Sequence, residues 1–116
     1  MNGVESRPYT FDAYQEDAMR TCNLRRPYDM LVNSIIGMCG EVGECADLVK
    51  KHLHQGHSLD EKRIFEELGD VLWYCAELAT ALGGTLEGVA IGNVYKLQKR
   101  YPDGFDPKRS LHREDE

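Results

Sequence analysis

Apolar residues recur at helical spacing along two long central segments of the chain. In the first segment, steps of four and three residues separate the apolar positions Leu31, Ile35, Met38, Val42, Cys45 and Val49. The second segment repeats these steps at Ile64, Leu68, Val71, Cys75, Leu78 and Leu82. Each pattern predicts an amphipathic helix with one apolar stripe. Because the connection between the segments is short, we expect the two helices to pack antiparallel through their stripes.

Capping and helix-breaking residues set the expected ends of these two helices. Pro27 suits the first turn of a helix over about 28–54. Ser58 and Glu61 have the spacing of a capping box, so we expect the next helix to begin there. Glycine follows both helices, in the pairs at 55–56 and 83–84, and glycine is the residue that helix C-termini prefer.

Shorter helices are predicted on both sides of this pair. Thr10 can cap a first helix over about 11–21, and Thr85 can cap a fourth that extends to about Tyr101. The fourth helix should place inward the residues Ala90, Val94, Leu97 and Tyr101. No segment alternates as a strand does, so the predicted fold class is all-α. We expect residues 10–105 to form the domain, with a flexible N-terminus over 1–9 and a charged, flexible tail over 106–116.

The composition narrows the functional class. The chain has 116 residues and a formal net charge of −6, from 20 acidic and 14 basic residues. A protein that binds nucleic-acid polymers would show a basic face, which this balance disfavours. The four cysteines form no C-x-x-C motif and follow no secretory signal, so we expect free thiols and a cytoplasmic location. No apolar run approaches the roughly 20 residues that a membrane span needs.

Two pairs of acidic residues lie beside the apolar stripes. Glu41 and Glu44 are three residues apart in the first central segment, and Glu67 and Asp70 are three apart in the second. Residues at this spacing share a helix face, so antiparallel packing can bring four carboxylates together at one edge of the core. A hard divalent cation would remove their mutual repulsion, and Mg²⁺ takes oxygen ligands. The sequence therefore predicts a Mg²⁺ site, with Mn²⁺ as a substitute.

Two other interpretations of the acidic pairs compete with a Mg²⁺ site. A Glu-x-x-Glu pair is common on solvated helix faces, although two pairs that both border a stripe favour a site. A di-iron bundle would need Glu-x-x-His, which no glutamate of the sequence provides. Glycines accompany the acids, and they would allow either a ligand or a neighbouring helix to approach closely; they are Gly37, Gly40, Gly43 and Gly69.

Basic and aromatic residues near the acidic pairs are candidates for substrate binding. Steps of three and four place Asn93, Lys96 and Arg100 on one helix face, where cations would suit phosphate oxygens. Their other interpretation is the usual preference of basic residues for a helix C-terminus. Lys51 follows the first acidic pair and has the same two interpretations. Trp73 follows Asp70 by three residues and could stack on a base, although core or interface packing is the favoured interpretation.

Three segments together resemble one protein family. GEVGE at 40–44, ELGDVLWY at 67–74 and NVYKLQKRYPDGF at 93–105 are similar to motifs of the MazG-like all-α nucleoside triphosphate pyrophosphohydrolases. The resemblance implies a four-helix core that assembles as a homodimer or homotetramer. It implies Mg²⁺-dependent hydrolysis of a nucleoside triphosphate to the monophosphate and pyrophosphate, for nucleotide-pool cleaning. The related phosphoribosyl-ATP pyrophosphohydrolases share the acidic pattern but fit the ELGD and RYPDGF segments less well.

The resemblance also assigns roles to individual residues. It implies that Glu41, Glu44, Glu67 and Asp70 hold the metal, and that Lys96 and Arg100 contact phosphates. The catalytic base would be Glu41 or Glu44, which takes a proton as water attacks a phosphorus atom. An alternative function is a catalytically silent helical dimer that binds a nucleotide or a partner. Further apolar residues of the central helices predict a partner surface; they are Ile36, Leu72 and Ala79.

Overall fold

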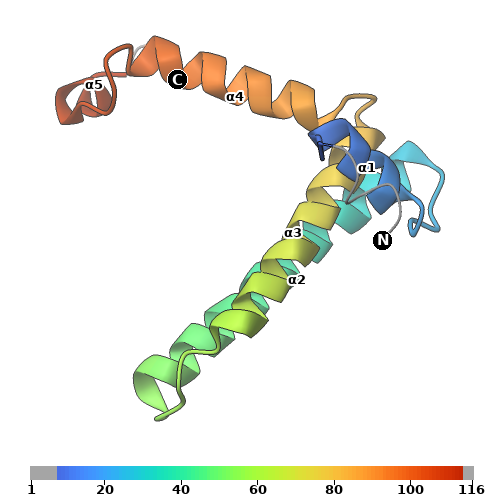
Figure 1. Cartoon of the computed structure of the whole chain (residues 1–116), viewed down its shortest axis with the longest axis vertical. Coiled ribbons are helices and arrows are strands. Elements are labelled where there is room, and N and C mark those ends of the chain that lie inside the picture. Colours follow the sequence, from blue (N-terminus) through green and yellow to red (C-terminus); the bar gives the residue numbers. More distant parts are fainter. Residues whose placement is uncertain (1–7, 114–116) are drawn as a thin grey trace. The chain divides into compact units, whose positions relative to one another are not determined.

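The computed structural model describes residues 8–113 (Figure 1). The helices in this range are α1 (Phe11–Met19), α2 (Pro27–His54), α3 (Glu61–Ala81), α4 (Leu86–Arg100) and α5 (Pro107–Leu111). The predicted all-α class is thereby confirmed. The chain divides into one compact unit up to Leu86 and a second unit from Glu87 onward, and each is described separately. No helix within residues 8–113 combines the length and the apolar content that crossing a membrane requires.

The ends of α2 and α3 follow the predicted glycine stops but not the predicted capping box. Gly56 and Gly83 have φ angles of 75° and 74°, in the left-handed region that glycine adopts readily. Asp60, not Ser58, caps α3, and its carboxylate accepts the backbone N–H of Arg63 at 3.0 Å. A carboxylate at a helix N-terminus also interacts favourably with the helix dipole, which a neutral serine hydroxyl does not.

The long helices α2 and α3 pack side by side, as predicted (Figure 1). The predicted stripes form the contact only in part: the Cys75 thiol of α3 lies 3.8 Å from the Met38 sulfur of α2, whereas Leu68 is 60% exposed. Glu67, predicted to lie at the edge of the contact, is only 6% exposed. The acids lie between the helices, in a polar seam that comprises Ser34, Gly37 and Glu41 of α2 with Glu67, Tyr74 and Glu77 of α3.

The small apolar core lies where α1 packs against α3. Ala18 of α1 is buried with Ala76 and Ala79 of α3, because alanine side chains let the two helices approach closely. Trp73 covers this core and donates its indole N–H to the backbone oxygen of Ala18 at 2.9 Å. Ala79 was predicted to face a partner but belongs to this core. Thr10 caps α1 as predicted, and its hydroxyl oxygen accepts the backbone N–H of Ala13 at 3.0 Å.

Both described ends of the chain make local contacts, and the flexibility expected for the ends stays a prediction. The Tyr9 hydroxyl donates a hydrogen bond to Asp17 at 2.6 Å, which ties the N-terminal side of α1 to the helix. Asp106 caps α5, which forms over residues predicted to be a flexible tail. Residues 1–7 and 114–116, which complete the predicted flexible ends, lie outside the described residues.

The second unit contains most of α4 and the segment that follows it. Val94, Leu97 and Tyr101 line an open hollow of about 380 Å³ together with Phe105. The Tyr101 and Phe105 rings lie 5.2 Å apart between centroids. Val94 and Leu97 remain 52% and 42% exposed, so their predicted inward position is not found within this unit. The apolar face of α4 is thus only partly covered.

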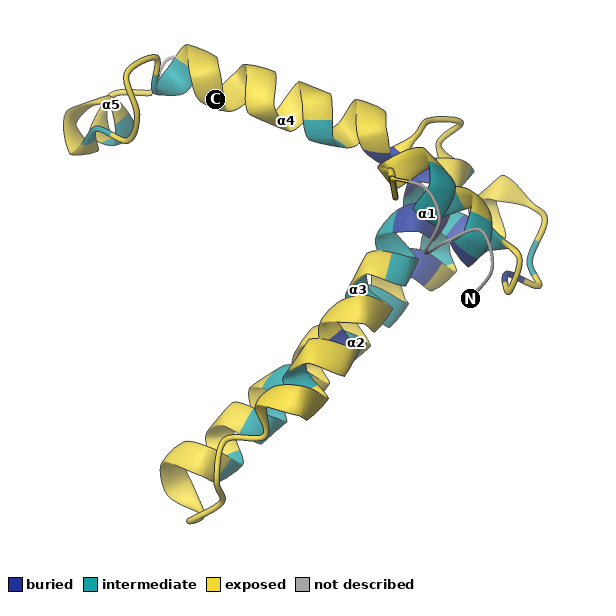
Figure 2. Ribbon diagram, viewed as in Figure 1, coloured by how far each residue is buried: buried dark blue, intermediate teal, exposed yellow. Residues whose placement is uncertain are grey.

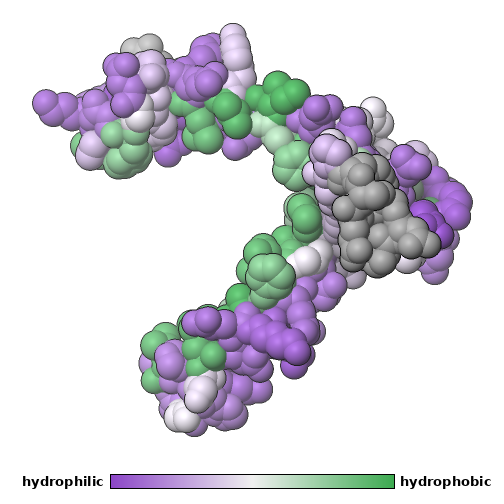
Figure 3. All heavy atoms as spheres, in the orientation of Figure 1, coloured by the Kyte–Doolittle hydropathy of each residue, from purple (hydrophilic) through white to green (hydrophobic). Residues whose placement is uncertain are grey.

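Much apolar surface of the α2–α3 hairpin is exposed (Figures 2 and 3). On α3, Phe65 and Leu68 are 77% and 60% exposed, and Leu72, one turn further on, is 37% exposed. On α2, Ile36 is 66% exposed. Side chains of this size are seldom left in water as a continuous row, because burial of each would stabilise the fold. Phe65, Leu68 and Leu72 form the apolar face of α3, a name kept below.

Candidate metal centre

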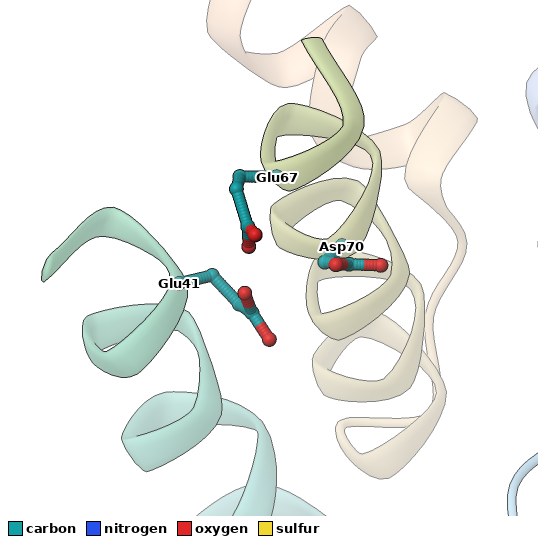
Figure 4. Close-up of side chains that lie close together, drawn as sticks. All are labelled: Glu41, Glu67 and Asp70. Atoms are coloured by element: carbon teal, nitrogen blue, oxygen red, sulfur yellow. The ribbon is translucent and has the colours of Figure 1, made fainter. Parts of the chain in front are cut away.

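Three carboxylates from two helices meet in the polar seam. Glu41, Glu67 and Asp70 each place one oxygen within 4.8 Å of the others, and these residues are named the acidic trio (Figure 4). Glu41 on α2 and Glu67 on α3 point toward one another across the seam. Asp70 joins them because residues three apart on a helix share a face. The structure therefore brings together three of the four acids that the sequence predicts as ligands.

The fourth acid, Glu44, lies next to the trio without being part of it. Its carboxyl group is exposed and lies one helical turn from Glu41 on α2. A hydrogen bond with Glu67 and the negative charge of that carboxylate raise the pKa of Glu44. Glu44 thus lies on the solvent-exposed side of the site and contacts Glu67.

The donor set of the trio fits a hard divalent cation. All its ligand atoms are carboxylate oxygens, the type that Mg²⁺ and Mn²⁺ prefer. Glu67 is 6% exposed, and within the described residues its Oε2 atom has no hydrogen-bond partner. An unpaired buried carboxylate oxygen costs free energy, and a cation would satisfy it. Asp70 is exposed, so one side of the trio is open to solvent.

Arg63 contacts the trio from one turn earlier on α3. Its Nε atom donates a hydrogen bond to Oε1 of Glu67 at 3.1 Å, and the arginine side chain is 54% exposed. After a hydrogen bond with Glu41, which has the largest effect, this contact holds the pKa of Glu67 below its usual value, and the Arg63 charge opposes the rise in the pKa of Glu44. Arg63 was not predicted to belong to the site, although its four-residue spacing from Glu67 signals such a contact.

The electrostatics of the trio favour the protonated form of Glu41. A hydrogen bond with Glu67, burial, and the charges of Glu67, Asp70 and Glu44 raise the pKa of Glu41 from 4.5 to about 7. The hydrogen bond with Glu41, followed by the contact with Arg63, holds the pKa of Glu67 below its usual value, so the pKa values of the two carboxyl groups are displaced in opposite directions. Carboxylates this close resist simultaneous ionisation unless a cation lies between them.

This raised pKa predicts a pH-dependent stability for the metal-free protein. Between pH 4.5 and about 7, folded Glu41 keeps a proton that the unfolded chain has released. The contribution of Glu41 to the free energy of unfolding therefore falls as the pH rises through this range. Thermal melts in chelator should show a steeper fall in Tm with pH for the wild-type protein than for Glu41→Gln. Equal slopes for the two proteins would contradict the assignment.

Tyr74 closes the polar seam next to the trio. The position of a Cβ atom on Gly37 would lie only 2.3 Å from two carbons of the Tyr74 ring, so the ring packs directly on the α2 backbone. Burial, followed by the charges of Glu41, Glu77 and Asp70, raises the pKa of the Tyr74 phenol. Close approach therefore explains the glycine at Gly37. The other glycines beside the acids meet nothing within 4 Å; they are Gly40, Gly43 and Gly69.

Two predicted substrate-binding residues of the first unit have other contacts. Lys51 pairs with Asp47 at 3.0 Å and lies about 15 Å along α2 from Glu41, at 1.5 Å of rise per residue. Trp73 hydrogen-bonds to Ala18 and Thr21 of the α1 region, which favours the packing interpretation. Neither contact tests a role in substrate binding, and that role stays a prediction.

The remaining predicted substrate-binding residues lie in the second unit. Asn93, Lys96 and Arg100 occur at steps of three and four residues on α4. That spacing places the three side chains on a common side of the helix, as the sequence predicts. Their assignment as phosphate contacts stays a prediction.

A second buried carboxylate, Glu77, was not predicted from the sequence. It is fully buried in the seam, and both its oxygens accept hydrogen bonds from the Asn33 amide, at 3.0 and 3.3 Å. The Cys22 thiol lies 3.4 Å from Oε2, and burial is the main cause that raises the pKa of this thiol. Glu77 follows Asp70 by seven residues, a spacing that signals the same helix face. Its partner Asn33 is 44 residues away, which no local pattern reveals.

Comparison with known proteins identifies the family. A model of the MazG nucleotide pyrophosphohydrolase domain matches residues 33–105, a range that contains the acidic trio, Glu44 and all of α3. The chain therefore belongs to the MazG nucleotide pyrophosphohydrolase family. A "Gene 37 protein" of Mycobacterium phage L5 is 44% identical over 73 residues, which span 60% of this chain and 64% of that relative. No solved structure matches the chain. A divalent metal is typical of the family, and the acidic trio is a candidate site for it.

Proposed function

We propose that this protein is a Mg²⁺-dependent nucleoside triphosphate pyrophosphohydrolase. It would convert a ribo- or deoxyribonucleoside triphosphate into the monophosphate and pyrophosphate, in the service of nucleotide-pool cleaning. The observation that carries the proposal is the acidic trio, in which buried Glu67 faces Glu41 and keeps one oxygen without a partner. Membership of the MazG family supports the class of reaction.

The residues of the site divide into ligands and a base. Glu41, Glu67 and Asp70 hold the cation, because their oxygens already converge. When bound, a divalent cation neutralises charge on the phosphates and lowers the pKa of a coordinated water. Glu44 lies outside the trio and is exposed, so it is the acid left available to accept the proton of the attacking water. Because Glu41 is a ligand in this proposal, Glu44 is favoured over Glu41 as the general base.

The test of this function is pyrophosphate release from each common ribo- and deoxyribonucleoside triphosphate, with Mg²⁺ and with chelator. We expect release from at least one triphosphate, dependent on Mg²⁺ and restored in part by Mn²⁺. The substrate that reacts fastest would identify the preferred base and sugar. No release from any of them by protein with an intact helical spectrum would contradict the proposal and favour the catalytically silent binding protein.

We also propose that the protein is a homo-oligomer, a dimer or a tetramer. The apolar face of α3 is exposed over Phe65, Leu68 and Leu72, and its burial against a second copy would remove this area from water. Light scattering of the purified protein tests this proposal, with an expected mass of two or four chains of 13.2 kDa. A mass of one chain would contradict it.

A further inference from the structure

We propose that Arg63 binds a phosphate group of the substrate, an inference that rests on the proposed function and deepens it. Arg63 is the basic side chain in contact with the acidic trio, through its 3.1 Å hydrogen bond to Glu67. Only Nε takes part in that bond. Within the described residues, the two terminal guanidinium nitrogens have no hydrogen-bond partner, and the side chain is 54% exposed. These two nitrogens form the planar fork that binds phosphate oxygens in pairs.

The negative charge of the site favours a basic side chain as a further phosphate contact. Glu41, Glu44, Glu67 and Asp70 together carry up to four negative charges, of which one divalent cation offsets two. A site that remains negative repels a triphosphate, so further positive charge is needed next to the cation. Arg63 already lies against Glu67, so a phosphate on a cation held by Glu67 comes within reach of its guanidinium.

The existing ion pair does not prevent this role. The Arg63 side chain is 54% exposed but the Glu67 side chain is only 7% exposed, so loss of Arg63 alone would leave a buried negative charge, and a cation held by Glu67 would compensate that charge. The four-residue spacing keeps the arginine near Glu67 while its long side chain can turn outward. Arg63 would therefore pair with Glu67 in the empty site and exchange that contact for phosphate oxygens when the substrate binds.

The test compares Arg63→Gln and Arg63→Lys with Lys62→Gln, which removes the same charge from an exposed neighbour. With the triphosphate that the wild-type protein hydrolyses fastest, Arg63→Gln should raise KM at least about tenfold, as expected for loss of a charge-assisted hydrogen bond. Its kcat should change by less than about threefold, because a contact made equally in the ground state and the transition state acts on KM. Arg63→Lys should give an intermediate KM, since it keeps the charge without the fork. Lys62→Gln should match the wild-type protein.

Metal binding distinguishes phosphate recognition from simple support of Glu67. Mn²⁺ titrations followed by electron paramagnetic resonance should give Arg63→Gln an affinity equal to or tighter than wild type, because the variant removes a positive charge from the site. If Mn²⁺ binding by Arg63→Gln weakened in proportion to the rise in its KM, the inference would be overturned. A KM of Arg63→Gln equal to that of Lys62→Gln would also overturn it.

The role of Arg63 can also be tested by ligand binding, which does not depend on hydrolysis. If the wild-type protein releases no pyrophosphate, calorimetry with Mg²⁺ and α,β-methylene analogues of the common triphosphates replaces the kinetics. If Arg63→Gln binds the analogue at least about tenfold more weakly than the wild-type protein, and Lys62→Gln binds it as tightly as the wild type, the role of Arg63 is supported without any hydrolysis. Equal binding by both variants, or no binding to the wild type, overturns it.

Discussion

Glu67→Gln should reduce Mg²⁺-dependent pyrophosphate release by at least about a hundredfold in kcat/KM, more than is typical for residues that only orient a metal ligand. The reason is the position of Glu67 at the centre of the site. It is the buried member of the acidic trio, it contacts Arg63, and its Oε2 atom has no other hydrogen-bond partner in the described residues. Glutamine keeps the shape of the side chain but removes the negative charge that a cation requires. A coupled assay for pyrophosphate measures the loss.

The matched control for this variant is Glu66→Gln. Glu66 is the preceding residue on α3, is exposed and does not belong to the trio, so its replacement removes the same charge outside the site. We expect Glu66→Gln to keep wild-type kinetics, and both variants to keep wild-type helical content. Equal activity of Glu67→Gln and Glu66→Gln would show that the acidic trio does not hold a catalytic cation.

Gly37→Ala should lower the free energy of unfolding by about 1–3 kcal/mol, the usual cost of forcing an extra carbon into a packed site. The new Cβ would lie 2.3 Å from the Cε1 and Cζ atoms of Tyr74 and 2.8 Å from Cδ1, so the ring must leave its position. Trp73 packs edge-to-face on that ring, with centroids 5.2 Å apart, which limits where the ring can move. Urea denaturation at a fixed protein concentration measures the change.

Gly40→Ala provides the contrast on the same helix. A Cβ at Gly40 meets nothing within 4 Å among the described residues, so only the helix preference of alanine should act. We expect this variant to be more stable than wild type, by about 0.5–1 kcal/mol. If Gly40→Ala destabilised the protein as much as Gly37→Ala, the close approach of Tyr74 to Gly37 would not explain the cost of Gly37→Ala.

The sequence predicts the long helices well because their signals are local and repeated. The alternating steps of four and three residues, with Pro27 before the first helix, predict a helix over about 28–54, and the structure has Pro27–His54. The start of α3 was harder to predict, because Ser58 and Asp60 are both competent caps two residues apart. The choice between them depends on the path of the loop, which no helix periodicity records.

The sequence predicts the membership of the acidic trio but not its surroundings. Glu67 and Leu68 are consecutive residues on α3. The helical pattern alone does not show which of the two side chains faces α2. An apolar stripe indicates burial, but Leu68 and Leu82 of the α3 stripe are 60% and 67% exposed within a single copy. The contacts of Glu77 with Asn33 and of Tyr74 with Gly37 join residues far apart in the chain, so only the fold reveals them.

The most direct test of Mg²⁺-dependent pyrophosphohydrolysis is a phosphorus NMR spectrum of the products from the best triphosphate substrate, with Mg²⁺ and with chelator. We expect equal amounts of nucleoside monophosphate and pyrophosphate, formed only when Mg²⁺ is present. Nucleoside diphosphate with inorganic phosphate, or product formation that is unaffected by chelator, would contradict it.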